Sequence, residues 1–134
     1  MAEYVLTMTE KQARLFMAAL DFYMRMRIGQ WYEAIDLCLP IETDDNNRQR
    51  KGEAKKALLD ARTIVMPDLP NDAAYYSVFS FPETRQAYNA LLSIRSCIAW
   101  HEHPEGGIGV IFDRPMGDAP KCEAICDEKR RVAK

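Results

Sequence analysis

The sequence is poor in features that mark secretion, membrane insertion or nucleic-acid binding. The first residues, Met1-Ala2-Glu3-Tyr4, lack the basic and apolar regions of a signal peptide, and no apolar run approaches the roughly 18 residues that a membrane span requires. Lys and Arg number 18 against 20 Asp and Glu, so a net charge of −2 gives no global attraction to nucleic acid or anionic lipid. We therefore expect a cytoplasmic protein whose partners include neither a membrane nor nucleic acid.

Residues that typically perform catalysis are also few. The four cysteines are Cys38, Cys97, Cys122 and Cys126, and without a secretory signal we expect them to be reduced thiols. His101 and His103 could join Cys122 and Cys126 in a zinc set, but C-x3-C is not the usual zinc spacing, so these four are weak candidates. We expect no cofactor, no metal and no catalytic residue.

The glycine-rich segment Pro104–Gly109 does not predict a phosphate-binding loop. Such loops lead from a strand into a helix, so that the amides of the helix N-terminus face the phosphate. Here a predicted helix precedes the glycines and a β-rich run follows them. The glycines are better explained by positive φ angles in a turn and by close packing.

Apolar residues at helical spacing predict four helices, over Glu10–Ile28, Trp31–Leu39, Arg48–Met66 and Pro82–Trp100. Thr9-Glu-Lys-Gln12 has the spacing of a capping box, and Gly29 is a suitable stop for the first helix. On the third helix we expect one dry face, made of Ala54, Ala57, Leu58, Ala61, Ile64 and Val65. On the fourth we expect a polar stripe of Gln86, Asn89, Ser93 and Ser96 opposite a core side of Ala87, Leu91, Ile94 and Ile98.

Two short runs have the composition of β-strands, Tyr4–Met8 and Ile108–Phe112. A lone strand leaves its backbone groups unsatisfied, so we expect the two to pair. The predicted fold is α+β and mainly α, with four to five helices packed on a two-stranded antiparallel ribbon whose second strand lies near 107–113. We expect a single compact domain over 1–115, followed at 116–134 by a tail or a short helix from Pro120.

Two arginines interrupt faces that should be dry. Arg27 continues the row Phe16, Leu20, Tyr23, and Arg95 lies among Leu91, Leu92, Ile98 and Ala99. A desolvated guanidinium needs an acceptor for its forked donors. One interpretation is an internal ion pair with Asp113, Glu105 or Asp36, or an aliphatic stem that reaches water. The other is an anion pocket lined by Arg27 and Arg95, with Arg25 at its rim.

Aromatic residues near element ends extend this hypothesis. Trp31, Tyr75, Tyr76 and Trp100 could stack on a ligand ring, form hot spots for a partner, or serve only as lids over the core. The predicted ligand-binding residues are Arg25, Arg27, Gln30, Tyr75, Arg95, Trp100, Glu105 and Asp113.

Several motifs together resemble a group of small phage and prophage proteins of unknown role. The motifs are Leu6–Gln12, Arg25–Gln30, Asn71–Tyr76, Ala99–Gly107 and Val110–Pro115. The resemblance does not extend beyond Met116, and it implies a phage accessory protein. That class includes inhibitors of host defence that occupy a host protein or sequester a signalling nucleotide.

Three hypotheses of function follow. The first is a non-enzymatic, oligomeric accessory protein that binds a host protein and inhibits a host defence system. The second is a binder that sequesters a phosphorylated or nucleotide ligand with Arg25, Arg27 and Arg95. The third is a metal-dependent enzyme using His101 and His103. Self-association is expected because a 15.4 kDa chain buries only about two thirds of its unfolded surface by itself.

Overall fold

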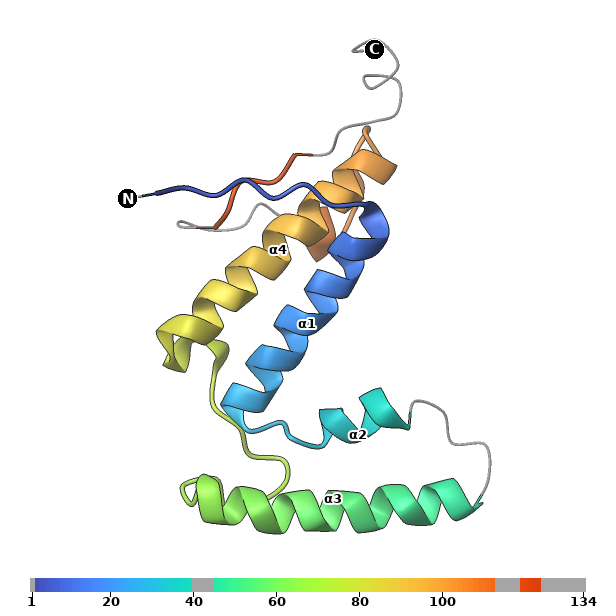
Figure 1. Cartoon of the computed structure of the whole chain (residues 1–134), viewed down its shortest axis with the longest axis vertical. Helices are drawn as coiled ribbons and strands as arrows, with labels where there is room; N and C mark the ends of the chain where they lie inside the picture. The colour runs from blue at the N-terminus through green and yellow to red at the C-terminus, as the bar shows by residue number, and fades with distance from the viewer. Residues whose placement is uncertain (1, 40–44, 113–118, 124–134) are drawn as a thin grey trace. The chain divides into compact units, whose positions relative to one another are not determined.

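The structure is a computed structural model that describes residues 2–39, 45–112 and 119–123 of the chain. These residues form the helices α1 (Glu10–Ile28), α2 (Glu33–Cys38), α3 (Asp45–Val65) and α4 (Pro82–Glu102) (Figure 1). Two 3₁₀ turns, η1 (Val78–Ser80) and η2 (Val110–Phe112), complete their regular structure. The bounds predicted for α1 are confirmed, and those of the other three helices differ by up to three residues at either end.

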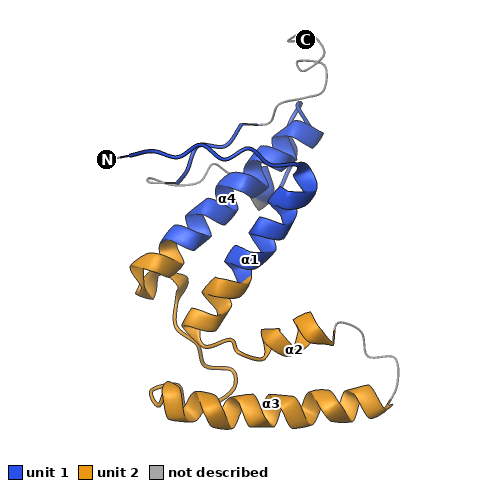
Figure 2. Cartoon of the chain, viewed as in Figure 1, with its two compact units in different colours: residues 1–21, 86–134 blue, residues 22–85 orange. Residues whose placement is uncertain are grey.

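The chain divides into two compact units (Figure 2). Unit 1 consists of Met1–Asp21 and Gln86–Lys134, and unit 2 of Phe22–Arg85. The division falls inside α1 and inside α4, so each of these helices supplies residues to both units. The single domain expected over 1–115 stays a prediction.

The two ends of α1 follow from local chemistry. The Thr9 backbone N–H donates to Gln12 Oε1 at 2.9 Å, and the Gln12 N–H donates to Thr9 Oγ1 at 3.2 Å, which is the reciprocal pair of a capping box. After Ile28, Gly29 takes a φ of +101° and the Gln30 N–H donates to the Arg25 carbonyl at 2.8 Å. This 6→1 bond around a left-handed residue is the Schellman stop that glycine favours.

In unit 2, α2 and α3 lie side by side and run in opposite directions (Figure 1). Lys51 Nζ contacts Asp36 Oδ1 at 3.1 Å between them, and Ile35 is buried on α2. The chain that follows α3 returns to the end of α1, where the Tyr76 N–H donates to the Ile28 carbonyl at 2.8 Å. A segment far along the sequence therefore covers the last turn of α1.

The covered face of α3 differs from the predicted one. Leu58 and the fully buried Arg62 lie toward the rest of unit 2, whereas Ala57, Ala61 and Ile64 are exposed. The apolar side chains of α3 occupy a wider arc than the surface covered by α2 and by the connector that follows α3 (residues 66–77). Position 62 lies on the covered side because its guanidinium finds carbonyl acceptors there.

In unit 1, the first part of α1 and the larger part of α4 run antiparallel (Figure 2). Arg14 Nη2 contacts Glu102 Oε1 at 2.7 Å, which joins the start of one helix to the end of the other. Ala87 and Leu91, two of the residues expected on the core side of α4, are buried, and so is Ala99.

The polar stripe predicted for α4 is wrong as a solvent-facing surface. Asn89, Ser93 and Ser96 are buried, and only Gln86 of the four is exposed. The physical reason is visible at Ser93, whose hydroxyl donates to the Pro120 carbonyl at 2.7 Å. Small polar side chains let a second chain segment approach this face and satisfy its hydrogen bonds.

The predicted β-ribbon is wrong, and with it the α+β class. No strand occurs among the described residues, which are helical where they are regular. Residues 2–8 form an open segment without regular structure (Figure 1), and their backbone takes part in none of the hydrogen bonds found among the described residues. Val110–Phe112 forms η2 where the second strand was expected.

Trp100 explains why this second run is not a strand. Its indole Nε1–H donates to the Phe112 carbonyl at 3.0 Å, and the two rings meet edge to face with centroids 5.3 Å apart. Gly106 and Gly107 leave room for these rings, since a Cβ at either position would lie within 3.0 Å of one of them. Within η2 the Phe112 N–H donates to the Gly109 carbonyl at 3.2 Å, so the chain turns here and is not extended as a strand beside Tyr4–Met8 would be. The close packing predicted for the glycines is therefore confirmed, without the strand.

Residues 119–123 contain no helix. The expected final helix from Pro120 is thus not formed over these residues, and its remainder, with Ile125, Cys126 and Val132, lies outside the described residues.

Candidate functional site

Arg25, predicted to lie at the rim of an anion pocket, has partners within unit 2. Its Nη1 donates to Gln30 Oε1 at 2.9 Å and to Glu33 Oε1 at 3.1 Å. The three residues thus link the end of α1 to the start of α2, where a cation also suits the dipole of the α1 C-terminus. Arg25 and Gln30, two of the predicted ligand residues, are brought together by a structural network.

Arg27 is paired with a residue that the sequence interpretation did not name. Its guanidinium lies 5.0 Å from the centroid of the Phe81 ring, and Nη2 is 3.8 Å from Glu83 Oε2. The acceptor is therefore Glu83 and not Asp36, which pairs with Lys51. Both side chains of the Arg27–Glu83 pair are about half exposed, so solvent weakens the attraction.

The predicted ligand residues of unit 1 are described by their own neighbours. Arg95 is half-buried on α4 and has interaction partners. Trp100 binds the Phe112 carbonyl, as described above. Glu105 Oε1 is 3.7 Å from His103 Nδ1, and both side chains are exposed. Asp113 lies outside the described residues.

The residue that sequence reasoning missed is Arg62 on α3, which is 2% exposed. Its Nη1 donates to the Gly29 carbonyl at 2.9 Å and to the Ala74 carbonyl at 3.0 Å, and Nη2 donates to the Asn71 carbonyl. Its Nε is buried without a hydrogen-bond partner. A fully buried guanidinium whose acceptors are all main-chain carbonyls joins α3, the stop of α1 and the connector.

A signal for Arg62 was present in the sequence. Ala54, Leu58, Arg62 and Met66 follow one another at spacings of four, so they form one row along α3. This is the same argument that singled out Arg27 on α1. The dry face predicted for this helix extends from Ala54 to Ile64 and Val65 and does not include position 62.

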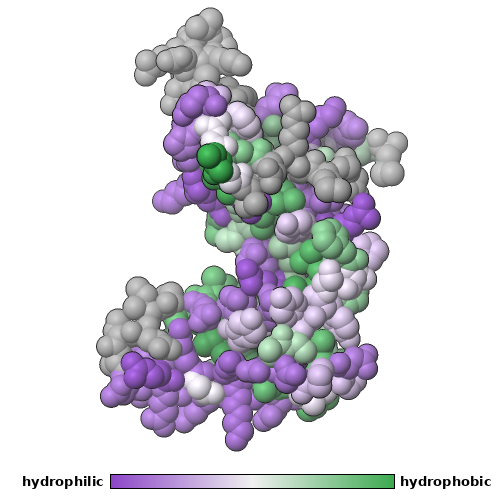
Figure 3. All heavy atoms as spheres, turned by 180° about the vertical axis from the view of Figure 1, so that it is seen from behind, coloured by the Kyte–Doolittle hydropathy of each residue, from purple (hydrophilic) through white to green (hydrophobic). Residues whose placement is uncertain are grey.

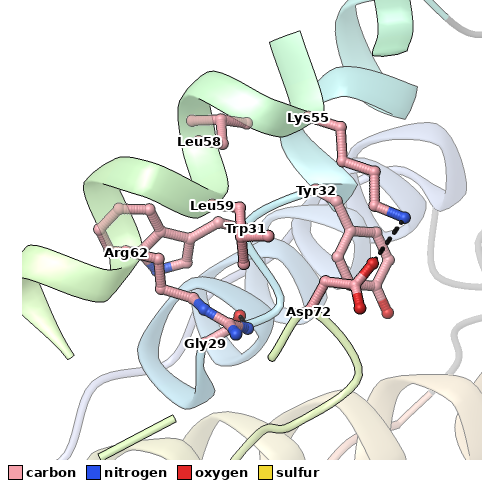
Figure 4. Close-up of a pocket in the computed structure, with 8 residues that line it drawn as sticks. All are labelled: Gly29, Trp31, Tyr32, Lys55, Leu58, Leu59, Arg62 and Asp72. Carbon is pink, nitrogen blue, oxygen red and sulfur yellow. Dashed lines mark hydrogen bonds and ion pairs between the residues drawn. The ribbon is translucent and has the colours of Figure 1, made fainter. Parts of the chain in front are cut away.

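A small cavity lies beside Arg62 in unit 2 (Figure 4). Its volume of about 10 Å³ suits about one water molecule and not an organic ligand. The lining residues are Gly29, Trp31, Tyr32, Lys55, Leu58, Leu59, Arg62 and Asp72. Trp31 Nε1–H donates to the Met26 carbonyl at 3.0 Å, which holds its indole in this wall.

At the edge of the cavity the Lys55 amine lies near both Asp72 and the ring of Tyr32 (Figure 4). Lys55 Nζ is 3.1 Å from Asp72 Oδ2 and 5.6 Å from the centroid of the Tyr32 ring. The hydrogen bond and the charge of Lys55 lower the pKa of Asp72 from its ordinary value. The pair is exposed, so we regard it as a link between α3 and the connector and not as a catalytic acid or base.

The structure describes His101, His103 and Cys122 of the four weak zinc candidates. Over the described ranges, no three His, Cys, Asp or Glu side chains gather as a metal site would require. His103 lies near Glu105 and near the Phe112 ring, at a centroid distance of 6.3 Å. Cys122 instead lies beside Cys97, a thiol that was not among the candidates. Cys126 lies outside the described residues.

Large apolar side chains reach the surface in several places (Figure 3). In unit 1 the most exposed include Tyr4, Val5, Leu6, Leu15 and Ile108. In unit 2 they include Leu37, Ile64, Val65, Tyr75 and Phe79. Exposed apolar residues that stand in a cluster, and not singly, mark contact surfaces for other molecules.

Comparisons with protein families, characterised proteins and solved structures find no match to this chain. The resemblance to small phage proteins therefore stays a prediction. Within the ranges that the structure describes, no helix combines the length and the apolar character that crossing a bilayer requires.

Proposed function

We propose that this chain is a non-enzymatic accessory protein that acts by binding another protein in the cytoplasm of a bacterial host. The resemblance to phage proteins makes a protein of a host defence system the proposed partner. The observation that carries the binding role is the open N-terminal segment, where Tyr4, Val5 and Leu6 are 88%, 93% and 73% exposed.

The chemistry of this segment suits addition to the edge of a partner's β-sheet. Its residues are β-forming and its backbone groups take part in no hydrogen bond found among the described residues, so they are available to a ladder. In an extended conformation Tyr4 and Leu6 point to one side and Val5 to the other. The capping box at Thr9 fixes where the segment joins α1.

The segment can supply a large part of the binding energy that recognition requires. Burial of a large apolar side chain contributes about 1.5–3 kcal/mol, so three contribute about 5–9 kcal/mol before the cost of ordering the chain. A micromolar complex requires about 8 kcal/mol. Main-chain hydrogen bonds and further contacts would then have to offset the ordering cost.

The experiment compares two variants in capture from a lysate of the host. In Tyr4→Ser/Leu6→Ser the segment loses two of its exposed apolar side chains, and in the control Leu37→Ser an exposed apolar residue on α2 is changed. We expect the wild type and the control to retain one stoichiometric partner and the double variant to lose it, with unchanged circular dichroism. Retention by the double variant would contradict the role of the segment, and repeated capture of no partner would contradict the binding role.

Nucleotide sequestration is less well supported, because Arg25 and Arg27 are engaged by Gln30, Glu33 and Glu83. A thermal-shift panel of nucleotides distinguishes the two functions, since a ligand that binds only the folded state raises the Tm with its concentration. A rise that disappears in Arg27→Met would favour sequestration over protein binding.

Self-association is a further part of the proposal, and the exposed side of α3 supports it. Ile64 and Val65 are 82% and 65% exposed, and Ala57 and Ala61 beside them allow close approach of a second helix. Light scattering of the wild type should show an oligomer that Ile64→Glu dissociates. A monomeric wild type at high concentration would contradict this part.

A further inference from the structure

Two thiols from distant parts of unit 1 lie together, Cys97 on α4 and Cys122 in the segment 119–123. Their register follows from one hydrogen bond, which the Ser93 hydroxyl donates to the Pro120 carbonyl at 2.7 Å. Ser93 and Cys97 are four residues apart on one face of α4. Pro120 and Cys122 are two residues apart in a segment that is not helical, and so lie on the same side of it.

This register places Cys122 over Cys97 when Pro120 lies over Ser93. The Cys97 thiol is near enough to act on the pKa of Cys122, which it raises. Cys97 is half-buried and Cys122 is exposed, so a small oxidant can reach the pair from solvent. Cys38, the other cysteine in the described ranges, belongs to unit 2 and has an exposed side chain.

We propose that Cys97 and Cys122 are an oxidation site at which a peroxide converts two thiols into an intramolecular disulfide. In the first step one sulfur, having lost its proton, attacks a peroxide oxygen, the O–O bond breaks, and a sulfenic acid and water form. In the second step the other sulfur attacks this sulfenic acid, the S–S bond forms, the S–O bond breaks, and a second water leaves. Overall two thiols and hydrogen peroxide give a disulfide and two waters, and the two electrons pass from sulfur to the peroxide.

The surroundings make this site slow to react. The Cys122 side chain is exposed as a whole but part of its surface is covered; this partial burial and the neighbouring Cys97 thiol raise the pKa of Cys122 to about 12, so this thiol is protonated at neutral pH. Since the thiolate is the nucleophile, a protonated pair resists brief exposure to oxidant. We therefore expect the pair to close slowly, under sustained oxidation.

The disulfide would connect the segment 119–123 covalently to α4. It would also close a loop that contains the end of α4, the turn at Gly106 and η2. Loops of this length stabilise a fold chiefly by restricting the unfolded chain. Oxidation would therefore add a covalent bond to a segment that a hydrogen bond already holds at Ser93.

The test uses the full chain carrying Cys38→Ser, to prevent bonds between molecules through the exposed thiol. After treatment with hydrogen peroxide, we expect the intact mass to fall by two hydrogens and peptide mapping to join the peptide of Cys97 to that of Cys122. The Tm should rise by on the order of 10 °C and return to its starting value with a thiol reductant.

Matched variants separate the site from general oxidation. Cys97→Ser and Cys122→Ser should each abolish the bond and the rise in Tm. Ser93→Ala keeps both thiols but removes the hydrogen bond that sets their register, so it should slow closure by about two- to tenfold, the range expected for one hydrogen bond. A bond between Cys122 and Cys126, accumulation of sulfinic acids in place of the disulfide, or unchanged closure in Ser93→Ala would overturn the proposal.

Discussion

Replacement of Arg62 by methionine tests the structural account of unit 2. The substitution keeps most of the side-chain volume but removes the donors to the carbonyls of Gly29, Asn71 and Ala74. The Asn71 carbonyl keeps the Ala74 N–H as a donor, so only the carbonyls of Gly29 and Ala74 lose theirs. A buried carbonyl left without a donor costs about 1–3 kcal/mol, which gives about 2–6 kcal/mol for two. Relief of the desolvated guanidinium, whose Nε has no partner, offsets part of this. We expect a net loss of about 2–4 kcal/mol, since the groups left behind are neutral carbonyls.

The assay exploits the placement of the two tryptophans, Trp31 in unit 2 and Trp100 in unit 1. In a Trp100→Phe background the fluorescence of Trp31, which lines the cavity beside Arg62, reports the unfolding of unit 2 in urea. The control is Arg48→Met, which removes an exposed arginine of α3 paired with Asp45 and should cost less than about 1 kcal/mol.

A lysine at position 62 separates charge from geometry. Arg62→Lys retains the positive charge but cannot reach three carbonyls with a rigid fork, so its loss of stability should lie between those of the wild type and Arg62→Met. If Arg62→Met unfolds within about 1 kcal/mol of the wild type, the carbonyl network contributes little and the reasoning is refuted.

Three further predictions concern single residues. Gly29→Ala should lower the free energy of unfolding of unit 2 by about 1–3 kcal/mol, because alanine disfavours a φ of +101° and its Cβ would collide with Leu69. Urea titration followed by Trp31 fluorescence measures this loss, and an unchanged midpoint would argue against the Schellman stop. Thr84→Val should lower the free energy of unfolding by about 1–2 kcal/mol, since the fully buried Thr84 hydroxyl lies 2.6 Å from the Val78 carbonyl and 2.9 Å from that of Phe81. Thermal unfolding measures this loss, and a variant with a higher Tm would show that the hydroxyl does not stabilise the fold. The stability of unit 1 should fall between about pH 9 and pH 12, because the pKa of Cys122 rises from 9.0 to about 12 on folding. The stabilising contribution of the protonated thiol is complete below pH 9 and is lost as the folded thiol ionises. Cys122→Ser should remove this part of the pH dependence of urea unfolding.

Elements bounded by local signals could be predicted from the sequence. The start and end of α1 depend on Thr9, Gln12 and Gly29, which act within one helical turn of the residues they cap. Helix propensity and apolar spacing likewise located α3 and α4 to within a few residues. Short-range physical chemistry decides such boundaries, and a single sequence contains all of it.

The β-ribbon could not be judged in this way. Five β-forming residues are compatible with a strand, a 3₁₀ turn or an open segment, and only tertiary contacts choose among these. At Phe112 the chain forms a 3₁₀ turn whose carbonyl is bound by the Trp100 indole, twelve residues earlier. The signal was present in an aromatic pair separated by glycines, but spacing alone does not reveal a ring-to-carbonyl bond.

The buried polar face of α4 illustrates a second limit. Asn89, Ser93 and Ser96 have the composition of a solvated stripe, and nothing local distinguishes water from a covering chain. The segment that covers Ser93 comes from Pro120, in a part of the sequence without helical periodicity. The candidate site shows the same limit, since the spacing rule found Arg27 but did not decide which arginine would be desolvated.

The acceptors of Arg62 have a consequence for how this protein can diverge. Every amino acid carries a main-chain carbonyl, so the residue at position 74 can change without removing an acceptor. No carboxylate has to change in step with the arginine, and in an alignment position 62 would appear constant with no covarying acidic partner. Distant relatives could therefore be sought by a sequence pattern. It consists of Ala, Leu and Arg spaced by four residues on a helix, as at Ala54, Leu58 and Arg62, followed by a connector that begins with prolines.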